Sequence, residues 1–244
     1  MVNKLTLQSV INKYYLGENE SVKWSIKDKT LTIDFMSVNK EVIGKIVHNN
    51  IDIEDSELAI FDTKKLLNLL SITQGDLMFE LEKGKSVYTK MKFADASFNL
   101  TYALADPLLI GKVGSVTEPE WDAVLPLEKE YVDNLVKAKN ALAGIGSMTI
   151  SVEVDLNGDN MCLFTFGDEQ GHNNKITYQM YGTIKQEKAE IPFNSDMFRN
   201  ILKENKDLES GSIYLSYQGL MKLEFKSEDT LSTYYMVRRE ESAF

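Results

Sequence analysis

Residues 61–70 read FDTKKLLNLL, and residues 193–202 read FNSDMFRNIL. Each stretch starts with a phenylalanine, continues with two residues whose side-chain oxygens can cap a helix, and then places apolar residues at helical spacing. The two stretches lie 132 residues apart, and the same offset relates two further aromatic pairs: Phe93 with Phe225, and Tyr102 with Tyr234. A fixed offset over about forty residues indicates two copies of one structural unit.

The rest of each copy predicts a second helix and several strands. Apolar residues at spacings of three and four, such as Leu7, Val10 and Ile11, are typical of one helix face. Helices are predicted over 6–16, 63–73, 128–140 and 195–206. Alternation of apolar and polar residues predicts strands over 22–26, 31–35 and 150–154, and further strands over about 77–82, 86–93, 97–104, 212–217, 220–226 and 231–238.

These elements predict an α+β fold of two tandem domains, each with two helices packed on β-sheets. The first domain covers residues 1–106 and the second covers residues 122–244. Between them, residues 107–121 contain two prolines and two glycines and show no clear period, so this segment is predicted to be an interdomain linker.

Composition is that of a globular protein that can bury a core. Hydrophobic residues make up 43% of the 244 residues, and no apolar run is long enough to span a membrane. Residues 1–6 lack the apolar segment of a signal peptide. The single cysteine, Cys162, lies in a strand-like stretch and is interpreted as a buried structural thiol, which fits a cytoplasmic protein.

Charge is distributed unevenly along the chain. The net charge is −10, which alone argues against tight binding of nucleic acid. The four predicted helices nevertheless carry nine basic and five acidic side chains, a net charge of +4, which leaves −14 for the rest of the chain. Acidic residues near helix starts are explained by the helix dipole, whereas the basic residues on later turns are not all explained by local structure.

No catalytic or cofactor motif accompanies this charge pattern. The two histidines, His48 and His172, lie far apart, and there is no glycine-rich phosphate loop. Residues 155–159 resemble the start of a calcium loop, but the misplaced glycine favours a hairpin turn. We therefore expect no enzymatic activity, no cofactor and no metal site, although a hidden pair of acidic residues remains open.

Tandem units, positive helices on an acidic body and the lack of a catalytic constellation together resemble a DNA sliding clamp, the polymerase processivity factor, of the T-even phage type. Residues 58–62, running into 66–71, resemble the clamp helix of that family, and residues 103–107 resemble its entry into the interdomain linker. The short tail that ends in Phe244 is also similar in character. The likeness covers nearly the whole chain in order and spacing.

The resemblance implies a DNA clamp fold that assembles as a ring. Two domains per chain imply a homotrimer, closed by head-to-tail contacts, whose helices line the hole. Such a ring encircles duplex DNA without sequence specificity and tethers the phage DNA polymerase for processive replication after an ATP-dependent clamp loader has placed it. It would act in the cytoplasm of the host cell.

Two sets of residues follow as site candidates. The side chains predicted to face DNA are Lys13, Lys64, Lys65, Lys137, Lys139, Arg199 and Lys203. The residues predicted to form an apolar pocket for a partner peptide are Leu108, Leu109, Ile110, Val113, Val116, Trp121 and Phe244. For the second set, the alternative is that the apolar side chains only fix the linker to the sheets.

Two other functions remain open. A duplicated, β-rich virion or tail subunit of a phage would also be acidic and free of motifs, but it has no reason to concentrate basic residues on its helices. An enzyme with an unrecognised acidic site is the second rival, and the low histidine count and missing cofactor loop argue against it.

Overall fold

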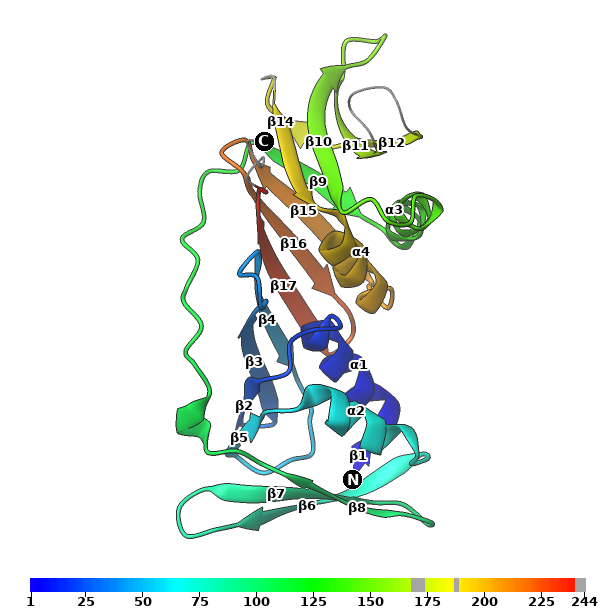
Figure 1. Ribbon diagram of the computed structural model, residues 1–244. Coiled ribbons are helices and arrows are strands. Elements are labelled where there is room, and N and C mark those ends of the chain that lie inside the picture. The colour runs from blue at the N-terminus through cyan, green and yellow to red at the C-terminus, as the bar shows by residue number, and fades with distance from the viewer. Residues whose placement is uncertain (168–173, 187–188, 240–244) are drawn as a thin grey trace. The chain divides into compact units, whose positions relative to one another are not determined.

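The computed structural model describes residues 1–167, 174–186 and 189–239, and the chain divides into two compact units (Figure 1). Unit 1 consists of Met1–Val38, Gly44–Ser115 and Asp229–Ser232. Unit 2 consists of Asn39–Ile43, Val116–Glu228 and the residues from Thr233 onward. The main division, between Ser115 and Val116, falls within the segment 107–121.

Unit 1 contains two helices and two four-stranded sheets. Its helices are α1 (Lys4–Tyr15) and α2 (Thr63–Ser71), and a short 3₁₀ helix, η1 (Pro107–Leu109), follows the last strand. One sheet has the order β1-β6-β7-β8, built from β1 (Val2–Asn3), β6 (Asp76–Lys83), β7 (Tyr88–Ala94) and β8 (Asn99–Ala103). The other has the order β4-β3-β2-β5, built from β2 (Val22–Lys27), β3 (Thr30–Met36), β4 (Val42–His48) and β5 (Ser56–Ile60).

Unit 2 repeats this arrangement. Its helices are α3 (Lys129–Ala141) and α4 (Ser195–Glu204). The order β13-β9-β15-β16-β17 joins β9 (Ala123–Leu127), β13 (Thr183–Ile184), β15 (Ser210–Ser216), β16 (Leu220–Lys226) and β17 (Thr230–Val237). The order β12-β11-β10-β14 joins β10 (Ser147–Val154), β11 (Asn160–Gly167), β12 (Lys175–Tyr181) and β14 (Glu190–Asn194).

The duplication is visible in the strand orders. In both units the strand after the first helix pairs with the following strand and with the strand that precedes the second helix: β2 with β3 and β5, and β10 with β11 and β14. The three strands after the second helix then form a meander, β6-β7-β8 in unit 1 and β15-β16-β17 in unit 2. The predicted α+β fold, with two helices in each copy, is confirmed.

The repeated stretches form capped helices, as predicted. The Asp62 side chain accepts a hydrogen bond from the Lys65 amide at 2.8 Å. Asn194 accepts from the amides of Asp196 and Met197 at 3.1 and 3.0 Å. These bonds satisfy helix amides that have no partner within the helix, and so they fix where α2 and α4 begin.

Local turns also follow the sequence. Asp28 and Lys29 both have positive φ values, as the two-residue turn between β2 and β3 requires. In the turn between β10 and β11, the Asp155 carboxylate accepts from the amides of Asn157 and Asp159 at 2.8 and 2.9 Å. Gly158 has φ +93°, and the predicted hairpin turn is confirmed.

Each unit buries its helices against its sheets. Leu66 and Leu70 of α2 are fully buried, as are Phe198 and Leu202 of α4. The Phe198 ring stacks on Phe164 of β11, with centroids 5.9 Å apart. Next to Phe164, Cys162 is fully buried, and burial raises the pKa of its thiol to about 12, so the prediction of a structural thiol is confirmed.

Candidate nucleic-acid interface

The four helices form two packed pairs, α1 with α2 in unit 1 and α3 with α4 in unit 2 (Figure 1). Each helix turns its apolar stripe inward and leaves its other face to solvent. The basic residues predicted to face DNA all lie on these four helices. Their exposure separates them into three groups.

Two exposed lysines lie on the first turn of α2. Lys64 and Lys65 are both exposed, and neither ammonium group takes part in an ion pair within the described residues. Their backbone amides are already bonded, Lys64 to a Glu20 carboxylate oxygen at 3.0 Å and Lys65 to Asp62. The side chains are therefore free to attract an anion.

Two of the predicted DNA-facing residues are buried, and the prediction was wrong for them. Lys13 and Lys139 are each 2% exposed. Each follows a buried valine by three residues, Lys13 after Val10 and Lys139 after Val136, so each lies on the buried face of its helix. That spacing is present in the sequence and would have identified both as packed side chains.

Lys139 forms an ion pair that joins α3 to α4. Its ammonium nitrogen lies 3.1 Å from the Asp196 Oδ1, and Asp196 is on the first turn of α4. A buried ammonium group needs such a partner, because an unpaired charge in the interior is costly. Lys139 thus holds two helices together.

The remaining basic residues of unit 2 are exposed to different degrees. Lys137 is exposed and has no ion pair within the described residues. Arg199 has a side chain 33% exposed, lies 4.0 Å from Asp196 and donates to Asn200. Lys203 is 63% exposed in its side chain and lies 3.2 Å from Glu204.

Sequence analysis missed the role of Lys4. Its ammonium group donates to the carbonyl oxygens of Ser71 and Thr73 at the end of α2. Helix α1 begins at Lys4 and not at residue 6, because Asn3 caps it by accepting from the Thr6 amide at 3.1 Å. The Asn3–Thr6 spacing is a capping signal that could have placed the start correctly.

The predicted partner-peptide residues are divided between the two units. In unit 1, Leu108 and Leu109 on η1 are 91% and 78% exposed, while Ile110 and Val113 are half-buried. In unit 2, Val116 is half-buried. Phe244 lies outside the described residues.

Trp121 is held by its own unit. Its indole nitrogen donates to Glu118 Oε2 at 3.2 Å, and its ring lies 5.7 Å from the Tyr214 ring. Glu118 Oε1 accepts from Tyr235 at 2.5 Å and from Lys222 at 3.0 Å. For Trp121, the alternative interpretation, that the residue fixes the linker to a sheet, is the one that the structure supports.

Glu118 and its partners Trp121, Lys222 and Tyr235 form a cluster, here called the Glu118 cluster, in which the pKa values of Glu118 and Tyr235 are shifted. The hydrogen bond from Tyr235, followed by that from Lys222, lowers the pKa of the Glu118 carboxyl. Burial, together with the bond to Glu118, raises the pKa of Tyr235 to about 12. Both groups keep their ordinary charge at neutral pH, which suits a structural anchor.

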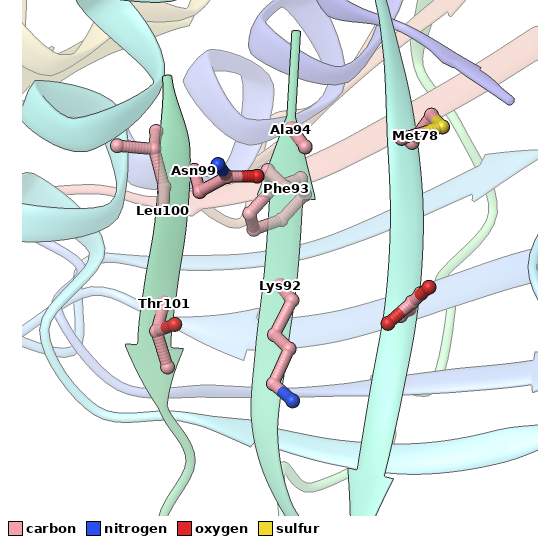
Figure 2. A pocket seen from close by; sticks show the side chains of 8 residues that line it. Met78, Lys92, Phe93, Ala94, Asn99, Leu100 and Thr101 are labelled. Carbon is pink, nitrogen blue, oxygen red and sulfur yellow. The ribbon is translucent and has the colours of Figure 1, made fainter.

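Two hollows lie in unit 1. One, of about 150 Å³, lies over β6, β7 and β8 and is lined by Met78, Lys92 and Thr101 among others (Figure 2). The other, of about 240 Å³, is lined by His48, Asn50 and Asp229 among others. Neither is lined by a predicted site residue.

In the described part of the chain, no group of three or more His, Cys, Asp or Glu side chains is placed to hold a metal ion.

Comparison with known proteins gives a fold. No family model matches the chain, and no curated protein matches it in sequence. The crystal structure of the proliferating cellular nuclear antigen from Entamoeba histolytica matches with a TM-score of 0.75 at 14% identity, covering 98% of this chain and 96% of that chain. The PCNA2–PCNA3 complex from Sulfolobus tokodaii matches with a TM-score of 0.74 at 12% identity, covering 98% of each chain.

Within the described residues, no helix is long and apolar enough to cross a membrane. The likeness to the antigen covers 98% of this chain and therefore extends over both units. The T-even phage type remains a prediction. The chain has the PCNA-like DNA clamp fold, with two copies of an α+β unit.

Proposed function

We propose that this chain is a sliding clamp that encircles duplex DNA as a homotrimer and tethers a replicative DNA polymerase. The main support is the clamp fold over the full length of the chain, with a unit that occurs twice. A closed ring cannot leave DNA by dissociation, so its contacts with the duplex need no base recognition. The clamp itself would catalyse no reaction.

Unpaired strand edges support assembly. Within the described residues, β8 hydrogen-bonds only to β7 in its sheet, and β12 only to β11. An exposed edge presents free backbone groups that can pair with another chain. Strand β8 lies in unit 1 and β12 in unit 2, so head-to-tail pairing of β8 with β12 of a second copy would give a heterologous contact that can close a ring.

Exposed lysines on the helices support contact with DNA. Lys64, Lys65 and Lys137 offer ammonium groups without an ion pair in the described part of the chain. Arg199 is partly exposed, and Lys203 is exposed. Contacts of this kind are made with phosphates, are independent of sequence and weaken with salt. They suit a protein that moves along DNA.

Leu108 and Leu109 support a partner site. Two neighbouring leucines with most of their surface in water are unusual, and such side chains often contact another protein. We propose that they help to bind a peptide of the polymerase and of an ATP-dependent loader. A phage origin for polymerase and loader follows only from the resemblance to the T-even type.

The first experiment is native mass by light scattering over a dilution series, followed by loading on circular DNA. A mass near three times 27.7 kDa that falls on dilution is expected for a closing trimer. A monomer at every concentration would exclude the ring. An open-ended series of larger species would favour the virion subunit instead.

A further inference from the structure

The helix pairs of the two units differ in charge. Helices α1 and α2 carry four basic and no acidic residues, whereas α3 and α4 carry five basic and four acidic residues. Unit 1 therefore has a helical charge of +4 and unit 2 of +1. We propose that Lys64 and Lys65 of unit 1 supply the principal contact with DNA phosphates, and that the helices of unit 2 contribute little because their own carboxylates neutralise them. This inference rests on the proposed clamp function.

The difference is greatest at equivalent positions. With the offset of 132 residues, Lys64 corresponds to Asp196 and Lys65 to Met197. An acid on the first turn, such as Asp196, interacts favourably with the helix dipole, and a lysine there interacts unfavourably. The stability of α2 therefore does not explain its two lysines, whereas the attraction of a polyanion does.

The lysines of α2 are also uncommitted. Glu20 and Asp62 lie beside them, but both carboxylates bond to backbone amides of the first turn. No ion pair of Lys64 or Lys65 occurs within the described residues, and both side chains are exposed. An approaching phosphate would meet two free ammonium groups from adjacent residues.

Within the described residues, Lys129 and Lys137 form no ion pair, whereas the other three basic residues on α3 and α4, and Lys206 just after α4, pair with carboxylates. These pairs are Lys139 with Asp196 at 3.1 Å, Arg199 with Asp196 at 4.0 Å, Lys203 with Glu204 at 3.2 Å and Lys206 with Asp133 at 3.0 Å. The bond from Lys206 is the main cause of the lowered pKa of Asp133, to which Lys137 and Lys129 add by their charge. Lys137 thus lies in the field of a carboxylate, and contact between a phosphate and these residues must compete with the existing partners.

The partner that fits is a phosphodiester backbone without sequence preference. Two lysines per subunit give a weak contact that can be exchanged from one phosphate to the next, and unit 2 adds little that would hold the duplex in one place. Asymmetry of this kind would favour one part of each subunit as the surface on which DNA rests.

The test compares two double variants with the same change in charge. Lys64→Ala with Lys65→Ala alters unit 1, and Lys137→Ala with Lys203→Ala alters unit 2. The full-length protein is titrated against a short blunt duplex of mixed sequence at several salt concentrations. The slope of log affinity against log salt counts the phosphate contacts, at about 0.9 per contact.

We expect the unit 1 variant to lower affinity about tenfold at low salt and to reduce the slope by about 1 to 2, as the loss of one or two phosphate contacts implies. The unit 2 variant should change affinity less than about threefold and leave the slope nearly unchanged. Light scattering confirms that both variants keep the mass of the parent protein. If a lysine-to-alanine pair fails to fold, the corresponding lysine-to-glutamine pair replaces it.

Each other result overturns the inference. Equal losses in both variants would exclude the asymmetry but leave the clamp intact. A larger loss in the unit 2 variant would reverse the assignment. Failure of the parent protein to form a ring and to bind duplex DNA would exclude the proposed function, and the inference with it.

Discussion

Helices α2 and α4 hold equivalent places in the two units. Their buried residues and their caps are alike, whereas their exposed residues differ in charge. Leu66 and Phe198 are both fully buried at matching positions, and Asp62 and Asn194 both cap their helix. At the exposed position between the cap and the buried residues, α2 has Lys64 where α4 has Asp196. Packing and capping therefore restrict which residues can occupy the buried and capping positions of the two copies. The exposed positions are not restricted in this way and can differ in charge.

The largest effect should come from emptying the core at the matched positions. Phe198→Ala should lower the free energy of unfolding by about 3–5 kcal/mol, and Leu66→Ala by about 2–5 kcal/mol, because each leaves a cavity beneath its helix. Urea denaturation measures both. Lys203→Ala, at an exposed position on α4, serves as the control and should change stability by less than about 0.5 kcal/mol.

Losses below about 1 kcal/mol in both core variants would contradict tight packing of Leu66 and Phe198 beneath their helices. A large loss at Phe198 with none at Leu66 would show that only unit 2 depends on its second helix. The chain contains two tryptophans, Trp24 in unit 1 and Trp121 in unit 2. Variants that keep one of them can therefore report on each unit separately.

The same comparison shows why sequence analysis could place some elements and not others. Caps and turns depend on residues a few positions apart, so residues 61–70, 193–202 and 155–159 were assigned correctly. Strands β4, β5, β9, β12 and β14 were not assigned. For β5, β9 and β14 the pairing partners, β2, β15 and β10, are distant in sequence. Strand β12 does alternate, with the polar Lys175 and Gln179 exposed and Met180 buried, so its period was a signal present in the sequence.

Some features of the candidate site could likewise be predicted from the sequence, and others could not. A count of charges identified the basic helices, but it could not tell that Lys139 pairs with a carboxylate 57 residues away. Nor could it tell that Glu118 would gather Tyr235, Lys222 and Trp121 around one carboxylate. Such groups come together only through the fold of unit 2.

The Glu118 cluster gives the second prediction, because its polar anchor at Trp121 contrasts with the exposed leucines of η1. Glu118→Ala should lower the free energy of unfolding by about 1–2 kcal/mol, since three donors lose their acceptor and water replaces it only in part. Fluorescence of Trp121, measured in a Trp24→Phe background, should shift to the red. Glu120→Ala is the matched control, because the Glu120 side chain is 86% exposed and bonds only to Lys185 within the described residues.

An unchanged emission maximum in the Glu118 variant would show that stacking on Tyr214 is enough to hold Trp121. The anchor would then be apolar and the bonds to Glu118 would be secondary. A red shift in both variants would mean that Trp121 responds to any change near the end of the linker. The effect would then not be specific to Glu118.

The caps of α2 and α4 give a smaller effect. Asp62→Ala should cost about 1 kcal/mol through the loss of one cap. Asn194→Ala should cost somewhat more, because the Asn194 amide also donates to Glu41 at 2.6 Å. Asp62→Asn keeps a capping oxygen and should be nearly neutral, so a large loss there would mean that the charge of Asp62, and not its hydrogen bond, stabilises α2.

The smallest predicted effect is a pH dependence of stability that is expected in unit 1. In unit 1, His48 is 5% exposed, and its Nδ1 lies 2.8 Å from the Thr230 hydroxyl. Burial lowers the pKa of His48, the charge of Asp229 opposes this, and the charge of Lys13 adds to it. The unfolded chain, with a histidine pKa of about 6.5, then binds more protons than the folded chain just below that pH.

Stability of unit 1 should therefore fall as the pH drops below about 6.5, and it should level off once the folded histidine is protonated as well. Urea midpoints followed by Trp24 fluorescence in a Trp121→Phe background would show the decline. His48→Gln should remove it. A decline of the same size in the glutamine variant would assign the pH dependence to carboxylates, which titrate at lower pH, and would leave His48 as a packed but electrically silent member of the core.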